Sequence, residues 1–272
     1  MHPLLNIGIR AARRAGTVVV RALNRLDSID VASKGRNDFV SEVDRQAEQE
    51  IIATVRRAYP AHGFLCEESG VTDARPGGDE YVWIVDPLDG TTNFLHGFPQ
   101  FCVSIAVQVR GRVELAIVYD PLKQELFTAT RGGGAQLDER RIRVSKSRGL
   151  EGALIGTGFP YSSNQQWLDA YMAMLKAVTL ASAGVRRPGS AALDLAYVAA
   201  GRTDGFWELG LKPWDTAAGA LLITEAGGRV GTLTGEEYLL GPHVVAGSPK
   251  TYEALVELLR PHVPEELRAK RG

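Results

Sequence analysis

Acidic residues stand in short segments whose residue types and spacing suit metal binding. The stretch W-I-V-D-P-L-D-G-T-T-N-F, residues 83–94, runs from an apolar segment into Asp86 and Asp89. Pro87 suits the second position of a type I turn, and such a turn brings its first and fourth residues together. We therefore expect the strand to end at Asp86 and both carboxylates to face one small volume, where they could hold a cation. A solvated turn is the alternative for so short a motif.

Two further acidic segments lie far from this one in the chain. C-E-E-S spans residues 66–69, and K-P-W-D-T spans residues 212–216. Taken alone, the two glutamates of the first segment, Glu67 among them, are a solvated pair, and Asp215 is an N-cap for the helix that follows it. Spacing along the chain does not decide whether these acids converge with Asp86.

Backbone donors for an anion follow the two aspartates directly. Gly90, Thr91 and Thr92 can open a helix, and free N–H groups at a helix start attract phosphate. Carboxylates for a metal would then lie beside donors for an anion. By contrast, R-G-G-G-A at residues 131–135 is not followed by the Lys-Ser or Lys-Thr of a phosphate-binding loop, so we interpret it as a turn.

The elements that must position these residues begin with two helices joined by a loop or hairpin. The second helix is predicted from Ser41, where Ser41-x-x-Asp44 matches a capping box, through Tyr59. Its apolar stripe is Val43, Ala47, Ile51, Val55 and Ala58. Alternating apolar residues and short links then predict antiparallel strands. The expected strands are Tyr81–Val85, Phe101–Val109, Val113–Tyr119 and Glu125–Thr130.

The pattern changes near residue 150. Helices expected at about 164–178, 190–200 and 215–226 alternate with apolar runs at 153–155 and 243–246, which is typical of an α/β arrangement. We predict a single domain over residues 1–272. An antiparallel-sheet half with N-terminal helices, 1–150, would stack on an α/β half, 151–272, in alternating layers.

Composition excludes several classes of protein. With 31 Lys and Arg against 32 Asp and Glu, the net charge of −1 gives no general reason to expect a nucleic-acid or membrane partner, so any basic site must be local. Two cysteines without metal-ligand spacing favour neither a disulfide framework nor a zinc site, and we expect a cytoplasmic protein. The arginines near the N-terminus would suit a presequence, but we favour an amphipathic helix with Leu5, Ile9, Ala12 and Val19 facing the core.

Four ordered motifs resemble the inositol monophosphatase family. They are G-F-L-C-E-E-S-G, W-I-V-D-P-L-D-G-T-T-N-F, G-S-A-A-L-D-L-A-Y-V-A-A-G-R and W-E-L-G-L-K-P-W-D. The resemblance covers essentially the whole chain. It implies an α/β fold, the alternating α-β-α-β-α sandwich of the inositol monophosphatase and fructose bisphosphatase superfamily. It also implies a Mg²⁺-dependent phosphomonoesterase that forms a homodimer and is sensitive to lithium.

The same resemblance implies a metal shell for two to three Mg²⁺ ions. Asp86 would bridge two ions, Glu67 and the backbone carbonyl of Leu88 would complete one of them, and Asp89 and Asp215 would complete the other. Such an all-oxygen shell is what Mg²⁺ prefers. Paired cations would neutralise the phosphate and acidify a water, so no covalent nucleophile is required.

Catalytic roles carry over to Glu67 and to Thr91, which would orient the attacking water with Asp44 behind it. Helix capping is the alternative for Asp44. An acid at Glu208 could accept two sugar-alcohol hydroxyls and so favours inositol, and a surface glutamate is the alternative interpretation. Lys34 matches a basic position beside the site. The implied substrate contacts are Asp89, Gly90, Thr91, Gly189, Ser190, Ala191, Glu208 and Asp215.

Two departures from the family pattern fall at the substrate edge. Pro188 stands directly before Gly189, and Ser190, which also suits an N-cap, stands where many relatives carry threonine. Arg186 and Arg187, just before this edge, could face a substrate, a dimer partner, another protein or solvent.

The resemblance leaves the substrate and the partners open. The expected substrates are myo-inositol monophosphates, and related activities on sugar or nucleotide phosphates would keep the metal shell and change only its rim. Bacterial relatives also take part in ribosomal RNA transcription complexes with RNA polymerase and Nus factors, which makes a non-catalytic binding role the alternative. We expect no membrane partner and no direct DNA contact.

Overall fold

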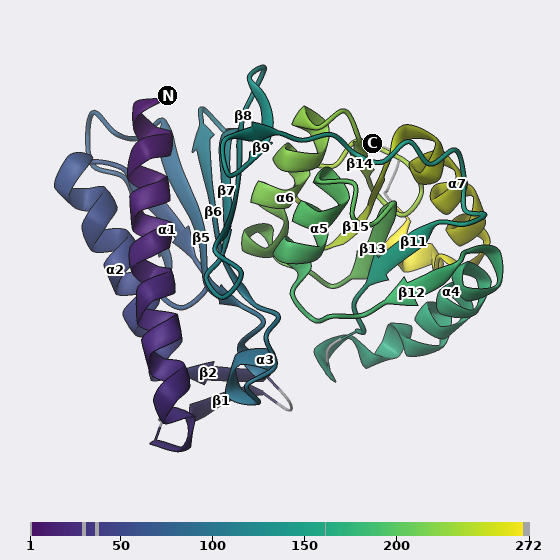
Figure 1. Ribbon diagram of the computed structural model, residues 1–272, viewed down its shortest axis with the longest axis horizontal. Coiled ribbons are helices and arrows are strands. Elements are labelled where there is room, and N and C mark those ends of the chain that lie inside the picture. Colours follow the sequence, from purple (N-terminus) through teal and green to yellow (C-terminus); the bar gives the residue numbers. More distant parts are fainter. Residues whose placement is uncertain (1, 29–30, 36–37, 161, 269–272) are drawn as a thin grey trace.

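The computed structural model describes residues 2–28, 31–35, 38–160 and 162–268. Within these ranges, five alternating layers of helix and sheet are stacked (Figure 1), as predicted. The helices are α1 (Pro3–Ala22), α2 (Glu42–Ala58), α3 (Thr91–Leu95), α4 (Leu168–Ala181), α5 (Ala191–Ala199), α6 (Pro213–Glu225) and α7 (Pro249–Leu259). The pair α1 and α2 forms one outer layer, α5 and α6 the central layer, and α4 and α7 the other outer layer.

The first sheet lies between α1–α2 and α5–α6. Its neighbouring strands from β9 to β5 are all antiparallel, whereas β3 runs parallel to β5. In spatial order its strands are β10 (Arg140–Arg141), β9 (Gly134–Leu137), β8 (Glu125–Thr130), β7 (Arg112–Asp120), β6 (Cys102–Val109), β5 (Tyr81–Asp89), β3 (Gly63–Cys66) and β4 (Gly70–Thr72). The hairpin β1 (Val31–Gly35) and β2 (Asp38–Ser41) stands apart from it, beside α3 in Figure 1.

The second sheet begins beyond residue 150 and is mixed. Its strand β11 pairs parallel with both its neighbours, whereas β15 pairs antiparallel with both of its own. Its spatial order is β12 (Gly184–Arg186), β11 (Leu154–Thr157), β13 (Gly205–Leu209), β15 (His243–Gly247) and β14 (Arg229–Gly231). The boundary near residue 150 thus separates the two sheets. We keep the division into two halves of one domain as our interpretation.

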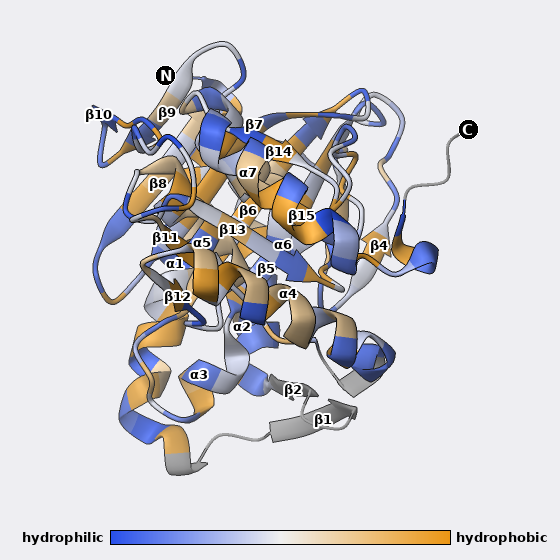
Figure 2. Ribbon diagram, turned by 90° about the vertical axis from the view of Figure 1, so that its right-hand side faces the viewer, coloured by the Kyte–Doolittle hydropathy of each residue, from blue (hydrophilic) through white to orange (hydrophobic). Residues whose placement is uncertain are grey.

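Amphipathic patterning explains the outer helical layer. Leu5, Ala12 and Val19 of α1 are buried against the sheet, and hydrophobic and hydrophilic residues alternate along this helix (Figure 2). The capping box predicted for α2 is present, because the Asp44 carboxylate accepts a hydrogen bond from the Ser41 N–H at 2.8 Å. The stripe of α2 is buried as far as Val55, but Ala58, at the last turn, is exposed.

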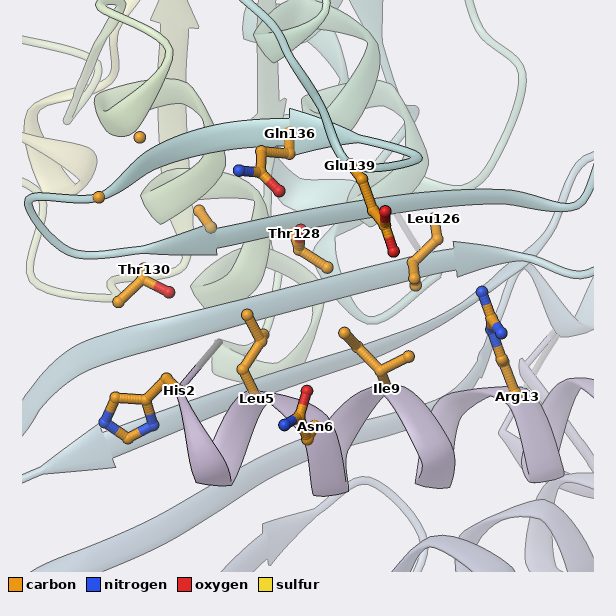
Figure 3. Close-up of a pocket in the computed structure, with 13 residues that line it drawn as sticks. His2, Leu5, Asn6, Ile9, Arg13, Leu126, Thr128, Thr130, Gln136 and Glu139 are labelled. Carbon is orange, nitrogen blue, oxygen red and sulfur yellow. The ribbon is translucent and has the colours of Figure 1, made fainter.

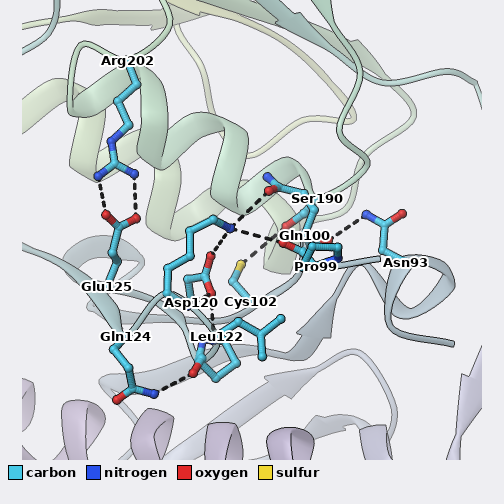
Figure 4. Close-up of polar contacts among 12 residues, drawn as sticks. Asn93, Pro99, Gln100, Cys102, Asp120, Leu122, Gln124, Glu125, Ser190 and Arg202 are labelled. Atoms are coloured by element: carbon cyan, nitrogen blue, oxygen red, sulfur yellow. Dashed lines mark hydrogen bonds and ion pairs between the residues drawn. The ribbon is translucent and has the colours of Figure 1, made fainter. Parts of the chain in front are cut away.

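Polar contacts join the two halves. The guanidinium of Arg202 pairs with Glu125 through two nitrogens (Figure 4). The Glu225 carboxylate, at the end of α6, accepts hydrogen bonds from the N–H groups of Gly132 and Gly134, both at 2.8 Å. The glycine-rich turn therefore already holds an anion, supplied by the chain itself. None of the helices within the described ranges has the length and apolarity to cross a bilayer.

Candidate active site

An irregularity in β5 brings Asp86 and Asp89 onto one face of the sheet. Asp86 lies opposite Ser104 and Asp89 lies opposite Cys102, so three steps along β5 match two steps along β6. Such a bulge returns the two aspartates to the same face, since residues two apart on β6 share a face. The prediction that the strand ends at Asp86 in a type I turn is wrong, because pairing resumes at Asp89.

Three aspartates from both halves of the chain meet at the layer between the sheets. Asp86, Asp89 and Asp215 each offer a carboxylate oxygen, and these atoms all lie within 4.8 Å of one another. Asp86 is buried, whereas Asp89 and Asp215 are half-buried. Glu67, which follows β3, lies close enough for its negative charge to raise the pKa of Asp86. The structure thus brings together four acids that are far apart in the sequence.

Burial and the negative charges of this cluster raise the pKa values of Asp86 and Asp215. Burial raises the pKa of Asp86 well above its ordinary value, and the negative charges of Glu67, Asp89 and Asp215 raise it further. Burial and the charge of Asp89 likewise raise the pKa of Asp215, against the lowering by the Lys212 N–H. Carboxylates packed in this way are stabilised when a cation neutralises them.

Asp89 is oriented by the start of α5. Its Oδ2 atom accepts hydrogen bonds from the Ser190 hydroxyl and from the Ala192 N–H, both at 2.7 Å. These bonds partly offset the effect of burial, which raises the pKa of Asp89. Ser190 does occupy the N-cap position of α5, but its hydroxyl makes no capping hydrogen bond and serves Asp89 instead.

Asp215 lies inside the first turn of α6, not before it. The helix begins at Pro213, and the Asp215 carboxylate accepts a hydrogen bond from the Lys212 N–H at 2.8 Å. The alternative interpretation of Asp215 as the N-cap is therefore wrong, because Lys212 occupies that position. From this place in the first turn, the Asp215 carboxylate is held by the backbone at the start of α6 and also offers an oxygen within 4.8 Å of those of Asp86 and Asp89.

Thr91 links the aspartate strand to α2. The Thr91 hydroxyl lies 2.8 Å from Oδ1 of Asp44 and 3.1 Å from the carbonyl oxygen of Leu88. Asp44 is fully buried and also accepts hydrogen bonds from Ser41 through its other oxygen. Asp44 therefore caps its helix and holds Thr91 at once, so the two interpretations of Asp44 are compatible.

Glu48 is a residue of this site that the sequence analysis missed. It is 3% exposed, and its two oxygens accept hydrogen bonds from the N–H groups of Glu68 and Ser69 at 2.9 and 3.0 Å. These contacts fix the segment that carries Glu67. The available signal was the position of Glu48 one helical turn after Asp44, on the same face of α2.

Glu208 lies inside the molecule and is not a surface glutamate. It is 6% exposed on β13, and a Cβ atom added to Gly158 would lie 1.9 Å from its Oε1. Burial raises the pKa of Glu208 well above its ordinary value, with further raising by Asp194, Asp215 and Asp89. This acid therefore lies beside the aspartate cluster, in space that a glycine leaves free.

Asn93 ties the two halves together at the substrate edge. Its side-chain nitrogen lies 2.7 Å from the carbonyl oxygen of Gln100 and 2.8 Å from that of Pro188. Pro188 thus contributes its carbonyl oxygen to this contact. The next residue, Gly189, has a φ of 91°, a conformation that favours glycine. Lys34 has no described side chain, so its predicted position lies outside the described residues.

Two further residues beside the cluster carried no sequence signal. The Cys102 thiol lies 3.6 Å from the Ser190 hydroxyl (Figure 4) and 3.8 Å from the Asp89 carboxylate. Asp194 on α5 is 4% exposed, and burial followed by the charge of Asp89 raises its pKa well above the ordinary value. Arg187 lies with its guanidinium 5.1 Å from the ring centre of Phe159.

The five alternating layers, with an acidic cluster between the two sheets, define a layered α/β protein with a candidate site for a metal ion. The model of the inositol monophosphatase family matches residues 1–264, and this chain belongs to that family. Members of the family are metal-dependent phosphatases. The cluster in this chain offers only oxygen ligands and carries an excess of negative charge, which suits a hard divalent cation.

Similar proteins carry two kinds of name. The chain is 54% identical to Nus factor SuhB of Pseudomonas aeruginosa and 49% identical to Nus factor SuhB of Escherichia coli, over 98% of this chain and all of each relative. The crystal structure of extragenic suppressor protein suhB from Bartonella henselae is similar with a TM-score of 0.92 and 42% identity, covering 96% of this chain and all of that one. Inositol monophosphatase from Anabaena (Nostoc) sp. PCC 7120 is similar with a TM-score of 0.83 and 36% identity, covering 97% of each chain.

Proposed function

We propose that this protein is a Mg²⁺-dependent phosphomonoesterase that hydrolyses myo-inositol monophosphates. The observation that carries the proposal is the convergence of Asp86, Asp89 and Asp215 within 4.8 Å, next to the hydrogen bond between Thr91 and Asp44. Glu67 and the Leu88 carbonyl would complete the ligand set. Bound there, Mg²⁺ would neutralise the phosphate and lower the pKa of a water.

The chain's own residues would orient the attacking water and the phosphate. Because the Thr91 hydroxyl donates its hydrogen to Asp44, its oxygen is free to accept a hydrogen bond from the attacking water. The backbone N–H groups of Gly90 and Thr91 would contact the phosphate. Attack by an oriented water needs no covalent enzyme intermediate.

The polyol would be bound by residues of the second half of the chain. Glu208 would accept hydroxyl hydrogens of the inositol ring, and the segment Gly189, Ser190 and Ala191 would contact the ring beside Asp89 and Asp215. Two acids, Glu208 and Asp194, near the ring favour a neutral polyol over a second phosphate, since like charges repel. This favours inositol monophosphates over the sugar or nucleotide bisphosphates of related phosphatases.

Phosphate release from a substrate panel with Mg²⁺ tests the substrate, and Asp215→Asn tests the site. We expect inositol monophosphates to be preferred, with inhibition by lithium, and the variant to lose most turnover. We also expect the variant to lose the rise in melting temperature that Mg²⁺ gives the unsubstituted protein. A variant that keeps full activity at saturating Mg²⁺ would contradict the metal shell, whereas preference for a nucleotide bisphosphate would overturn the substrate alone.

A second candidate function is participation in a transcription complex. Its support is the name Nus factor carried by relatives that match 98% of this chain at 54% and 49% identity. We expect capture of RNA polymerase or Nus factors by the protein and by Asp89→Asn alike, because the interaction would lie outside the catalytic chemistry. A homodimer also remains a prediction, which sedimentation at micromolar concentration tests.

A further inference from the structure

The outer face of α1 is unusually rich in arginine. The exposed side chains after its first turn are arginines or neutral polar residues, and the helix contains no Asp or Glu. These residues are Asn6, Arg10, Arg13, Arg14, Thr17 and Arg21. Arg10, Arg13 and Arg14 among them are the arginines that suggested a presequence, and the other face of this helix is packed against the sheet.

The neighbouring helix α2 adds to this charge. Arg45, Arg56 and Arg57 are exposed, whereas Asp44 and Glu48 are buried in the site on the inner side. The acids of α2 that remain nearer the surface are Glu42 and Glu50, which lie 3.6 Å from Arg25 and Arg14 respectively. The layer therefore carries excess positive charge on a chain whose net charge is −1.

Three of the arginines have no acidic partner among the residues that the structure describes. Within the described ranges, no carboxylate lies within 4.0 Å of Arg10, Arg13 or Arg21. Arg13 and Arg21 line a hollow of about 560 Å³ with Tyr119 and Pro121, and Arg10 and Arg13 line a second hollow of about 330 Å³. A third hollow, about 410 Å³, lies between α1 and β8–β9 with Arg13 at one end (Figure 3).

We propose that the outer face of α1 binds single-stranded RNA through its phosphates. Arg10 and Arg21 are 11 positions apart, or about 16 Å along the helix axis, which is long enough for the three arginines to contact several phosphates of one strand. The guanidinium fork matches phosphate geometry with two hydrogen bonds, which a lysine ammonium does not provide. Unpaired arginines also lose no ion pair when they bind.

The composition of this face argues against an acidic protein as the partner. Stable protein interfaces depend on buried aromatic or aliphatic anchors. The large apolar side chains that are exposed within the described ranges lie on other elements, and none belongs to α1 or α2. A face that offers charge without an apolar anchor suits a phosphate backbone better.

The shape of the layer favours a single strand over a duplex. α1 lies flat beside α2 against the sheet (Figure 1), so it does not project into a major groove as a recognition helix does. A flexible strand can follow such a flat face. Because the aspartate cluster lies on the other side of the sheet, this binding does not rest on the proposed phosphatase activity.

Fluorescence anisotropy with a labelled 20-nucleotide single-stranded RNA of mixed sequence tests the proposal. The variant is Arg10→Gln, Arg13→Gln and Arg21→Gln together. The matched control replaces three exposed cations of the other half by Gln: Lys146, Arg148 and Lys176. Three phosphate contacts predict a logarithmic salt slope of about −2, or about a 20-fold loss of affinity between 50 and 200 mM KCl.

We expect the α1 variant to bind RNA at least 10-fold more weakly and the control variant to bind within 2-fold of the unsubstituted protein. Both should hydrolyse phosphate monoesters normally, which separates failure of this proposal from failure of the proposed function. Equal loss in both variants, or affinity that does not change with salt, would overturn the proposal. Tighter binding of a duplex DNA, or of a polyglutamate peptide, would overturn the choice of partner.

Discussion

The substitution Glu48→Gln tests how the site holds Glu67. Both carboxylate oxygens of Glu48 accept hydrogen bonds, from the N–H groups of Glu68 and Ser69 at 2.9 and 3.0 Å. Glutamine keeps one acceptor and turns an NH₂ group toward the other N–H, which loses its acceptor. Because residue 48 is only 3% exposed, water does not readily replace that acceptor. A hydrogen bond to a charged group contributes about 1.5–3 kcal/mol, so we expect about 2–4 kcal/mol less stability.

The functional effect should appear in the response to metal. When the segment after β3 loosens, Glu67 no longer lies fixed beside Asp86, and the Mg²⁺ concentration for half-maximal activity should rise about 10-fold or more. Saturating Mg²⁺ should restore much of kcat, because Glu48 itself touches no substrate. Mg²⁺ titration of phosphate release and urea unfolding measure the two effects separately.

Glu50→Gln is the matched control on the same helix. Glu50 makes only a surface ion pair with Arg14 at 3.6 Å, so its loss should change the free energy of unfolding by less than about 1 kcal/mol and leave the response to Mg²⁺ unchanged. If Glu48→Gln lowers stability as expected but responds to Mg²⁺ like the unsubstituted protein, Glu48 has only a structural role and our reasoning about Glu67 is refuted.

Three further predictions concern single groups. Thr91→Val should lower kcat at least about 100-fold while Thr91→Ser retains most activity, because only the hydroxyl bonds Asp44; equal losses in both would contradict a water-orienting role. Gly158→Ala should raise the KM for inositol monophosphate about 10-fold and that for p-nitrophenyl phosphate much less, because the added Cβ would lie 1.9 Å from Glu208; a parallel change in both would show general damage. Burial lowers the pKa of His243 from its ordinary 6.5 to about 4, so the unfolded chain binds the proton more readily and stability should fall as the pH drops from about 6.5 to 4. His243→Gln, which keeps an acceptor for the Gly210 N–H, should flatten that part of the stability curve, and an unchanged curve would exclude His243 as its cause.

The sequence predicted much of the fold, because local rules decide many of its elements. Alternation predicted β6 to within one residue at its start, and short links predicted its antiparallel neighbours. The capping box at Ser41 and Asp44 predicted the start of α2. Boundaries failed where no local signal marked them, as at α4, which begins at Leu168 and not near residue 164.

Tertiary structure decided how the acids come together. The residue types of Asp86 and Asp89 suggested metal binding, but a turn and a bulge both bring them together, and only the pairing of β5 with β6 distinguishes the two. Ser190 suited a helix cap until the layers placed its hydroxyl 2.7 Å from Asp89. The position of Glu48 one turn after Asp44 indicated the inner face of α2, but only the packing of the segment after β3 showed which N–H groups it binds.

What the sequence by itself determined is the kind of chemistry and the order of the elements, because residue type, capping and periodicity act over a few neighbouring positions. Only the folded structure decided which acids share one site and which arginines lie exposed on the outer helical layer. Contacts such as that between Thr91 and Asp44 join residues 47 positions apart, and packing between layers brings them within hydrogen-bond distance.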